Sequence, residues 1–206
     1  MPSDGKLDIN RILRSYSASA NKYFINSINL ASSGEIALAL ENVKDAQNTA
    51  LKAKKLIAAA LRKKLIPSTR AINMCLGSVE DARLYALAAT TGTKSFAYLA
   101  NYGKDKSTEK RLHSGVLSNF VAAIKLLGSV QLGECPIECY QKLKTAQANI
   151  TKISDDATKM NAEYIIYHEE INSIISALSA RLRHLAEAEI KMGKTNKGPS
   201  VTLPNI

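Results

Sequence analysis

The chain contains no tryptophan, and aromatic residues make up only 5% of its 206 residues. Glycine and proline are also scarce, with 10 and 5 residues respectively. Sheet proteins favour aromatic and β-branched residues and need frequent turns, so this composition argues against a sheet. Alanine, leucine and isoleucine dominate the hydrophobic residues, as expected for long helices joined by few turns.

The sequence also lacks the signals of membrane insertion and export. No uncharged run approaches the roughly 20 apolar residues that span a bilayer, and the start of the chain has no apolar signal core. We therefore expect no membrane partner and an intracellular location, or a location within a virion or another nucleoprotein assembly. In a reducing compartment Cys75, Cys135 and Cys139 stay as thiols.

Common catalytic motifs are missing as well. There is no phosphate-binding loop, no Gly-x-Gly-x-x-Gly and no Gly-x-Ser-x-Gly. His168-Glu169-Glu170 matches the start of the zinc protease pattern His-Glu-x-x-His, but Asn172 replaces the second histidine. The sequence predicts no enzyme, no cofactor and no metal. A helical enzyme that assembles its site from scattered residues stays as an alternative.

The remaining ionisable side chains are better explained by packing or charge than by catalysis. Cys135 and Cys139 are four residues apart at a predicted helix start, where the helix N-terminus would stabilise a thiolate. A metal would need two further ligands, so packing or capping is the preferred interpretation. His113 and His184 lie close to Arg111 and Arg183 in the sequence, and these basic surroundings suit contact with an anion better than with a metal.

Caps and helix breakers divide the chain into five or six helices. Asp8 or Asn10 can cap the first helix, Gly34 can end it in a left-handed conformation, and Pro67 stops the second. Pro136 suits the first position of a later helix, and Gly133 the end of the helix before it. The predicted helices span about 10–32, 35–65, 68–103 (with interruptions near Ser78 and at 90–93), 108–131, 136–153 and 155–192.

These helices predict an all-α fold, an antiparallel and largely up-and-down bundle. We expect one helical domain over residues 1–192, or two halves over 8–103 and 108–192, followed by a polar tail at 193–206. Both halves contain a helix, a Gly-Glu turn and a helix with Ala-Gln near its middle. This similarity indicates a possible duplicated helical hairpin, and chance likeness between alanine-rich helices explains it equally well.

The long C-terminal helix predicted over 155–192 would form the spine of the bundle. Its apolar residues recur at steps of three and four: Ala157, Met160, Tyr164, Tyr167, Ile171, Ile174 and Leu178. Arg181 and Arg183 interrupt the repeat, so we expect this end to face solvent or a partner. With Val201, Leu203 and Ile206 as anchors in the tail, these residues are the predicted assembly contacts of a homo-oligomer.

Positive charge is in excess. The net charge is +10 and the isoelectric point is about 9.5, which favours an acidic partner: nucleic acid, an anionic membrane or an acidic protein. No Asp or Glu occurs between Asp45 and Glu80, although seven cations do. The alternative is a charged helix face that only contacts solvent, and such a face would not need to lack Asp and Glu.

A helical wheel of 35–65 separates the charges from the apolar residues. The predicted core side holds Ile36, Leu40, Val43, Ala50, Ile57, Leu61 and Leu65. The opposite side holds Lys44, Lys52, Lys55, Arg62 and Lys63, and Arg70 follows in the same acid-free window. A row of cations on a rigid rod suits a phosphate backbone.

The sequence therefore predicts a non-enzymatic structural or assembly subunit, of packaging or coat type, that binds nucleic acid without sequence specificity. The alternative from a different class is a helical adaptor that binds protein between its hairpins.

Overall fold

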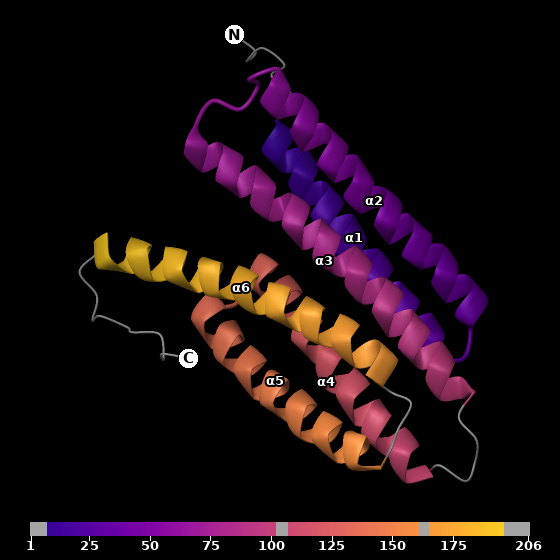
Figure 1. Cartoon of the computed structure of the whole chain (residues 1–206). Helices are drawn as coiled ribbons and strands as arrows, with labels where there is room; N and C mark the ends of the chain where they lie inside the picture. Colours follow the sequence, from indigo (N-terminus) through magenta and orange to yellow (C-terminus); the bar gives the residue numbers. More distant parts are fainter. Residues whose placement is uncertain (1–7, 102–106, 161–164, 196–206) are drawn as a thin grey trace. The chain divides into compact units, whose positions relative to one another are not determined.

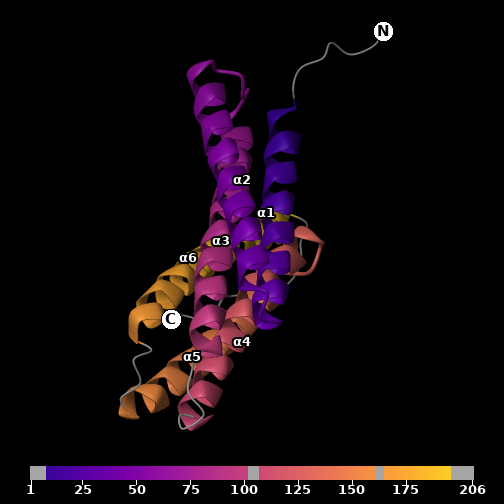
Figure 2. The same cartoon turned by 90° about the vertical axis from the view of Figure 1, so that its right-hand side faces the viewer.

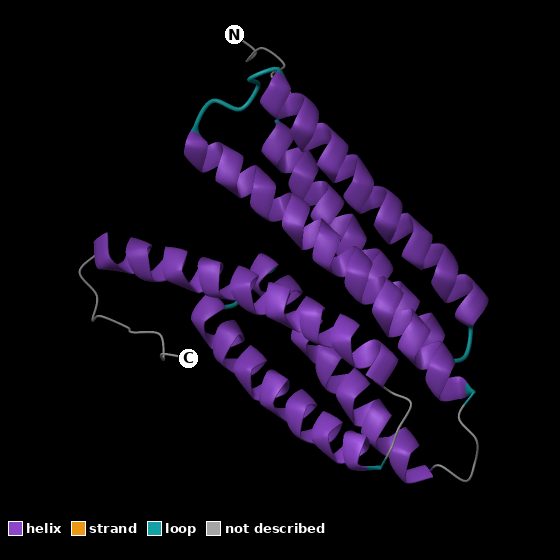
Figure 3. Cartoon of the chain, in the orientation of Figure 1, coloured by secondary structure: helices purple, strands orange, loops and turns teal. Residues whose placement is uncertain are grey.

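The computed structural model describes residues 8–101, 107–160 and 165–195. These residues form six α-helices and no strand, which confirms the all-α bundle (Figure 3). The chain divides into two compact units, Met1–Ala100 and Asn101–Ile206, each with three helices. Whether residues 1–192 behave as a single domain stays a prediction.

The first unit contains α1 (Ile9–Ser32), α2 (Ile36–Arg62) and α3 (Thr69–Ala100). Each of these helices packs against the other two, and consecutive helices run antiparallel in both views (Figures 1 and 2). The largest side chains of its core are Leu13, Phe24, Leu84 and Tyr85, all fully buried. The rings of Phe24 and Tyr85 lie 6.1 Å apart and tie α1 to α3.

The predicted caps of α1 and α3 and the predicted turn at Gly34 are confirmed, whereas α2 ends at Arg62 and not near Leu65 as expected. Asp8 caps α1, since its Oδ1 accepts the backbone N–H of Arg11 at 3.1 Å. Gly34 has φ +90°, and the chain then turns directly into α2. At the start of α3, Ser68 Oγ accepts the backbone N–H of Ala71 at 3.2 Å.

Helix α3 is continuous, so the predicted interruptions near Ser78 and at 90–93 are wrong. The hydroxyls that suggested them bond back to carbonyls one turn earlier: Ser78 to Met74 O at 3.3 Å, and Thr90 to Ala86 O at 2.8 Å. Such bonds satisfy a hydroxyl without leaving the helix. Burial of this face within the bundle outweighs the weak helix propensity of Ser, Thr and Gly.

The second unit contains α4 (Ser107–Gln131), α5 (Pro136–Lys159) and α6 (Ile165–Thr195). Consecutive helices are again antiparallel (Figure 1), and each contacts the other two. Gly133 takes φ +104° after α4, and Pro136 opens α5, both as predicted. The fully buried core residues include Phe120, Ile124, Leu127, Tyr140, Leu143, Ile150, Ile171 and Ile175.

The helix predicted over 155–192 is wrong in its bounds. Residues 155–159 are the end of α5, and Met160, expected in the apolar repeat, is 45% exposed at the C-cap. Ile171, Ile174 and Leu178 are buried in α6, as expected, whereas Tyr164 and the side chain of Tyr167 lie outside the described residues. No glycine or proline occurs between Lys159 and Ile165, so the sequence carries no breaker where α5 ends.

No helix among the described residues is both long and apolar enough to cross a membrane.

Candidate nucleic-acid interface on α2

Helix α2 owes its orientation to alanine. Its buried residues follow a spacing of three and four, and we call them the buried seam: Ala39, Val43, Ala46, Thr49, Ala53, Ile57 and Ala60. Ala39, Ala46 and Ala53 have no exposed surface at all. Small side chains let α1 and α3 approach α2 closely. The van der Waals contacts made at this short distance stabilise the packing without large side chains such as leucine.

This corrects the predicted core side of α2. Leu40, Leu61 and Leu65 were expected inside, yet they are 44%, 39% and 56% exposed. Val43 and Ile57 are buried, as predicted. The predicted core side was centred on the largest apolar residues of the helical wheel, whereas the residues buried in the bundle are mostly the small alanines. The true core side is therefore rotated about the helix axis relative to the prediction.

The predicted cations of α2 all remain on the solvent side. We call this set the basic face: Lys44, Lys52, Lys55, Arg62 and Lys63, each of which is exposed. Within the described ranges, none of the five forms an ion pair. Lys44 has acidic neighbours in Glu41 and Asp45 but pairs with neither.

Two arginines elsewhere in the chain contrast with these. Arg83 pairs with Glu80 at 2.6 Å, which raises the pKa of Arg83 through hydrogen bonding to that carboxylate. Arg183 pairs with Glu187 at 2.9 Å. A paired cation has part of its charge neutralised before any partner arrives. The basic face keeps its charge available.

The basic face is long and rigid. From Lys44 to Arg62 the rise of an α-helix gives roughly 27 Å. Basic residues project from an unbroken helix, so their spacing is set before a ligand arrives. Cations held in this way can contact successive phosphates of a nucleic-acid strand and release their counterions.

Three other cations lie within the acid-free window. Arg70, predicted as part of the site, is exposed on the first turn of α3 rather than on α2. Lys54 and Lys64 are exposed as well, and the wheel left them out of the prediction. Lys64 follows α2 with φ 52°, so a wheel that assumes a continuous helix misplaces it. The acid-free window itself identifies both residues.

The predicted assembly residues are only partly described. Arg181 is half-buried on α6, and Arg183 is exposed and paired with Glu187. Val201, Leu203 and Ile206 lie outside the described residues. Their role in assembly stays a prediction.

The three cysteines are free thiols, with Cys75 and Cys139 buried and Cys135 half-buried. Cys135 is the N-cap of α5, with Sγ 3.6 Å from Glu189 Oε2 of α6. Cys139 is buried, and its Sγ lies 3.6 Å from Glu134 Oε2. Burial and the Glu134 carboxylate raise the pKa of Cys139, which opposes any stabilisation of a thiolate by the helix N-terminus. Burial likewise raises the pKa of Cys75.

The histidines do not form a metal site. His113 is 1% exposed in α4, so the expected surface contact with an anion is wrong, and burial lowers its pKa. His168 Nε2 lies 2.7 Å from Asn172 Nδ2, the residue that replaces the second histidine of the protease pattern. Within the part of the chain that the structure describes, no three His, Cys, Asp or Glu side chains gather to hold a metal.

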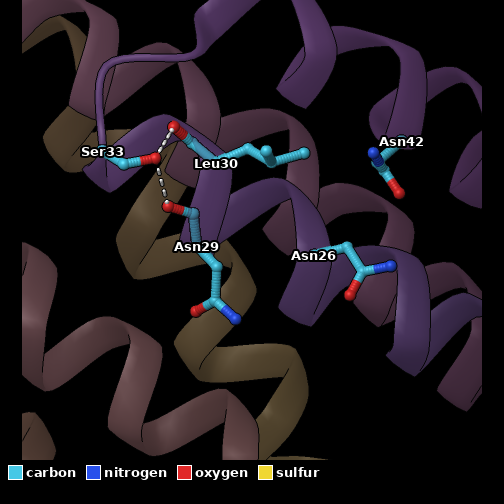
Figure 4. Close-up of a pocket in the computed structure, with 5 residues that line it drawn as sticks. All are labelled: Asn26, Asn29, Leu30, Ser33 and Asn42. Carbon is cyan, nitrogen blue, oxygen red and sulfur yellow. Dashed lines mark hydrogen bonds between the residues drawn. The ribbon is translucent and has the colours of Figure 1, made fainter.

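A shallow polar pocket lies beside the turn between α1 and α2 (Figure 4). Its lining consists of Asn26, Asn29, Leu30, Ser33 and Asn42. Asn42 Nδ2 donates to Leu38 O at 3.1 Å, and Ser33 Oγ donates to Leu30 O at 2.9 Å. None of the lining side chains is ionisable, so the lining offers no acid or base, and it holds no base that could activate the Ser33 hydroxyl.

Comparison with family models, with curated proteins and with solved structures finds no match to this chain. Function must therefore be argued from the basic face.

Proposed function

We propose that the chain is a non-enzymatic structural or assembly subunit that binds the phosphate backbone of nucleic acid through the basic face of α2. One observation carries the proposal: five exposed cations, none of which forms an ion pair among the described residues, follow α2, and four of them lie in the window of 46–79, which contains no acid. Leaving this much like charge uncompensated is unfavourable in the free protein, and binding a polyanion removes the repulsion.

The composition of α2 favours binding without sequence specificity. No aromatic residue occurs in α2, so bases have no ring on which to stack. Lysine, which contributes four of the five cations, acts on phosphate as a point charge and not as a bidentate reader of a base. A packaging or coat-like subunit requires this kind of contact, because it must bind whatever sequence it encounters.

A salt series of binding measurements tests the proposal. We expect fluorescence anisotropy with a labelled single strand and a labelled duplex to show affinity that falls steeply with salt. Replacing Lys52, Lys55, Arg62 and Lys63 by Gln removes about four phosphate contacts. On duplex DNA, the slope of log affinity against log salt should then flatten by about 3 to 4.

The control removes the same charge elsewhere. Four exposed lysines without ion pairs, Lys94, Lys110, Lys125 and Lys152, are replaced by Gln in a matched variant. Its net charge equals that of the α2 variant, so a smaller change in slope assigns binding to the basic face. Equal slopes for both variants, or no affinity at low salt, would contradict the proposal and favour the adaptor alternative.

A further inference from the structure

Helix α2 has a second seam, parallel to the buried one and displaced by one residue. Its members keep the spacing of four and three that lets one helix pack lengthwise on another. We call this the outer seam: Leu40, Lys44, Gln47, Leu51, Lys54, Ala58 and Leu61. All seven side chains are exposed, and among them the Gln47 amide also donates to Thr90 Oγ1 of α3.

The apolar members of the outer seam are spaced over its whole length. Leu40, Leu51 and Leu61 are 44%, 48% and 39% exposed, and the helix rise places the first and last roughly 31 Å apart. Single exposed leucines are ordinary, but three on one line with alanine between them form a contact strip. A straight apolar strip along a helix has the shape to pack lengthwise against one further helix.

The charges of α2 indicate which helix fits. Its first turns carry Glu41 and Asp45, whereas its second half carries cations alone. Consider a second α2 that runs antiparallel to the first, so that the numbers of two facing residues add up to about 102. This register sets Glu41 opposite Arg62. The same register sets Leu40 opposite Leu61 and Leu51 opposite its own copy at the two-fold axis.

The other directly facing positions of this register avoid like charges. Lys54 faces Asn48, Lys55 faces Gln47, and Lys44 faces Ala58. A parallel pair would instead set each lysine beside its own copy, which costs energy on a helix that already carries excess positive charge. The sequence of α2 is thus self-complementary in the antiparallel direction only, as an interface with two-fold symmetry requires.

We infer that α2 binds a second copy of the chain along the outer seam, antiparallel, with Glu41 of each copy beside Arg62 of the other. This inference goes beyond the proposed function, since it concerns self-association without any nucleic acid. The two-fold axis stands perpendicular to the plane of the two helices, so both basic faces point to the same side. The dimer therefore presents on one surface those cations of both basic faces that lie outside the outer seam and the Glu41–Arg62 pairs.

Charge exchange tests the register. Sedimentation velocity on the full chain, without nucleic acid, should show a reversible monomer–dimer equilibrium. Glu41→Arg and Arg62→Glu each turn two facing pairs into like-charge pairs, and each should weaken the dimer about tenfold. The double variant restores opposite charges with the net charge of the wild type, so it should regain most of the affinity.

A second pair of variants tests the apolar contact. Leu51→Glu places two carboxylates at the two-fold axis and should abolish the dimer. Leu132→Glu changes a residue that is 91% exposed outside α2 and should leave the dimer intact. Both positions are exposed, and thermal unfolding by circular dichroism checks that each variant is folded.

The inference is overturned if the chain stays monomeric at all concentrations, if the double variant is no tighter than the single ones, or if both leucine variants behave alike. Failure of the dimer leaves phosphate binding measurable, because the anisotropy experiment reads that binding separately. A monomer that binds an acidic amphipathic peptide, with the binding lost in Leu51→Glu, would assign the outer seam to a protein partner instead.

Discussion

Gln47 of α2 donates from Nε2 to Thr90 Oγ1 of α3 across 3.0 Å, while that hydroxyl donates to Ala86 O of its own helix. This hydrogen bond joins the middle of α2 to the middle of α3. It agrees with the rotation of α2 that the buried seam sets: the side next to Gln47 points to solvent, and the alanines of the buried seam point inward. The positions of the basic face and the outer seam both follow from this rotation.

Enlarging a buried alanine of α2 should therefore damage the first unit. Ala46→Leu adds three carbons at a position with no exposed surface, and overpacking should lower the free energy of unfolding by about 1–3 kcal/mol. Ala37→Leu makes the same change at an exposed site of the same helix and should alter it by less than about 0.5 kcal/mol. Urea unfolding compares the two. Equal losses would mean that the buried seam does not set the packing of α2.

The two helix-ending glycines should be costly to replace for a backbone reason alone. Gly34 and Gly133 have φ +90° and +104°, and an added Cβ would meet no atom within 4 Å at either site. Left-handed backbone disfavours residues with a Cβ, so Gly34→Ala and Gly133→Ala should each lose about 1–2 kcal/mol of stability. Thermal unfolding would measure it. Asn tolerates this conformation better than Ala, so Asn variants that are no more stable than the Ala variants would contradict the explanation.

Local signals made several helix ends predictable. The rotation of α2 about its axis and the reversal of the chain after α5 could not be predicted in this way. Asp8, Gly34 and Pro136 act through their own backbone or side chain, and each takes the expected role. The core side of α2 depends on how closely α1 and α3 approach, and a wheel of one helix contains no such information. The end of α5 near Met160 was also not predicted, because the apolar repeat in the sequence continues across a chain reversal that has no glycine or proline.

The cations of the candidate site were predictable because charge is read directly from the sequence. Exposure of Lys52 or Lys63 requires only that they lie away from the core, and a rotation of α2 by a fraction of a turn leaves that true. Lys64 was missed because it follows the end of α2 and has a left-handed backbone conformation, which a helical wheel does not represent. The outer seam was missed for the opposite reason: two of its three leucines, Leu40 and Leu61, were assigned to the core.

The thiols should differ in reactivity with an alkylating reagent. Burial and a neighbouring carboxylate raise the pKa of Cys139, and burial raises that of Cys75, both from an ordinary value of 9.0. Only the thiolate reacts, so both should be alkylated slowly by iodoacetamide in the folded chain, with Cys135, which is half-buried, ahead of them. Peptide mass spectrometry over time gives the order. Cys139 reacting first would contradict the geometry around Glu134.

Removing the carboxylate separates its effect from that of burial. Glu134→Gln keeps the size of the side chain but not its charge, so Cys139 should react faster while Cys75 is unchanged. A loss of packing would expose Cys139 through unfolding and would be seen as lower stability in the same variant. Faster reaction at unchanged stability isolates the electrostatic contribution.

The buried His113 should make the second unit sensitive to mild acid. Burial in α4 lowers its pKa below the ordinary 6.5, while nearby Glu109 raises it by a smaller amount. The unfolded chain therefore binds a proton at a pH where the folded chain does not. The stability held above pH 6.5 should fall as the pH decreases toward the folded pKa, by at most about 1.4 kcal/mol per pH unit.

Comparison with a variant that cannot titrate isolates this histidine. Urea unfolding of the wild type and of His113→Gln at pH 7.5, 6.5 and 5.5 gives two pH profiles, in which all other ionisable groups are shared. The wild-type profile should fall more steeply below pH 6.5, even if the variant is less stable throughout because glutamine packs differently. Parallel profiles would show that His113 takes up its proton equally in the folded and unfolded chain, which burial within α4 does not allow.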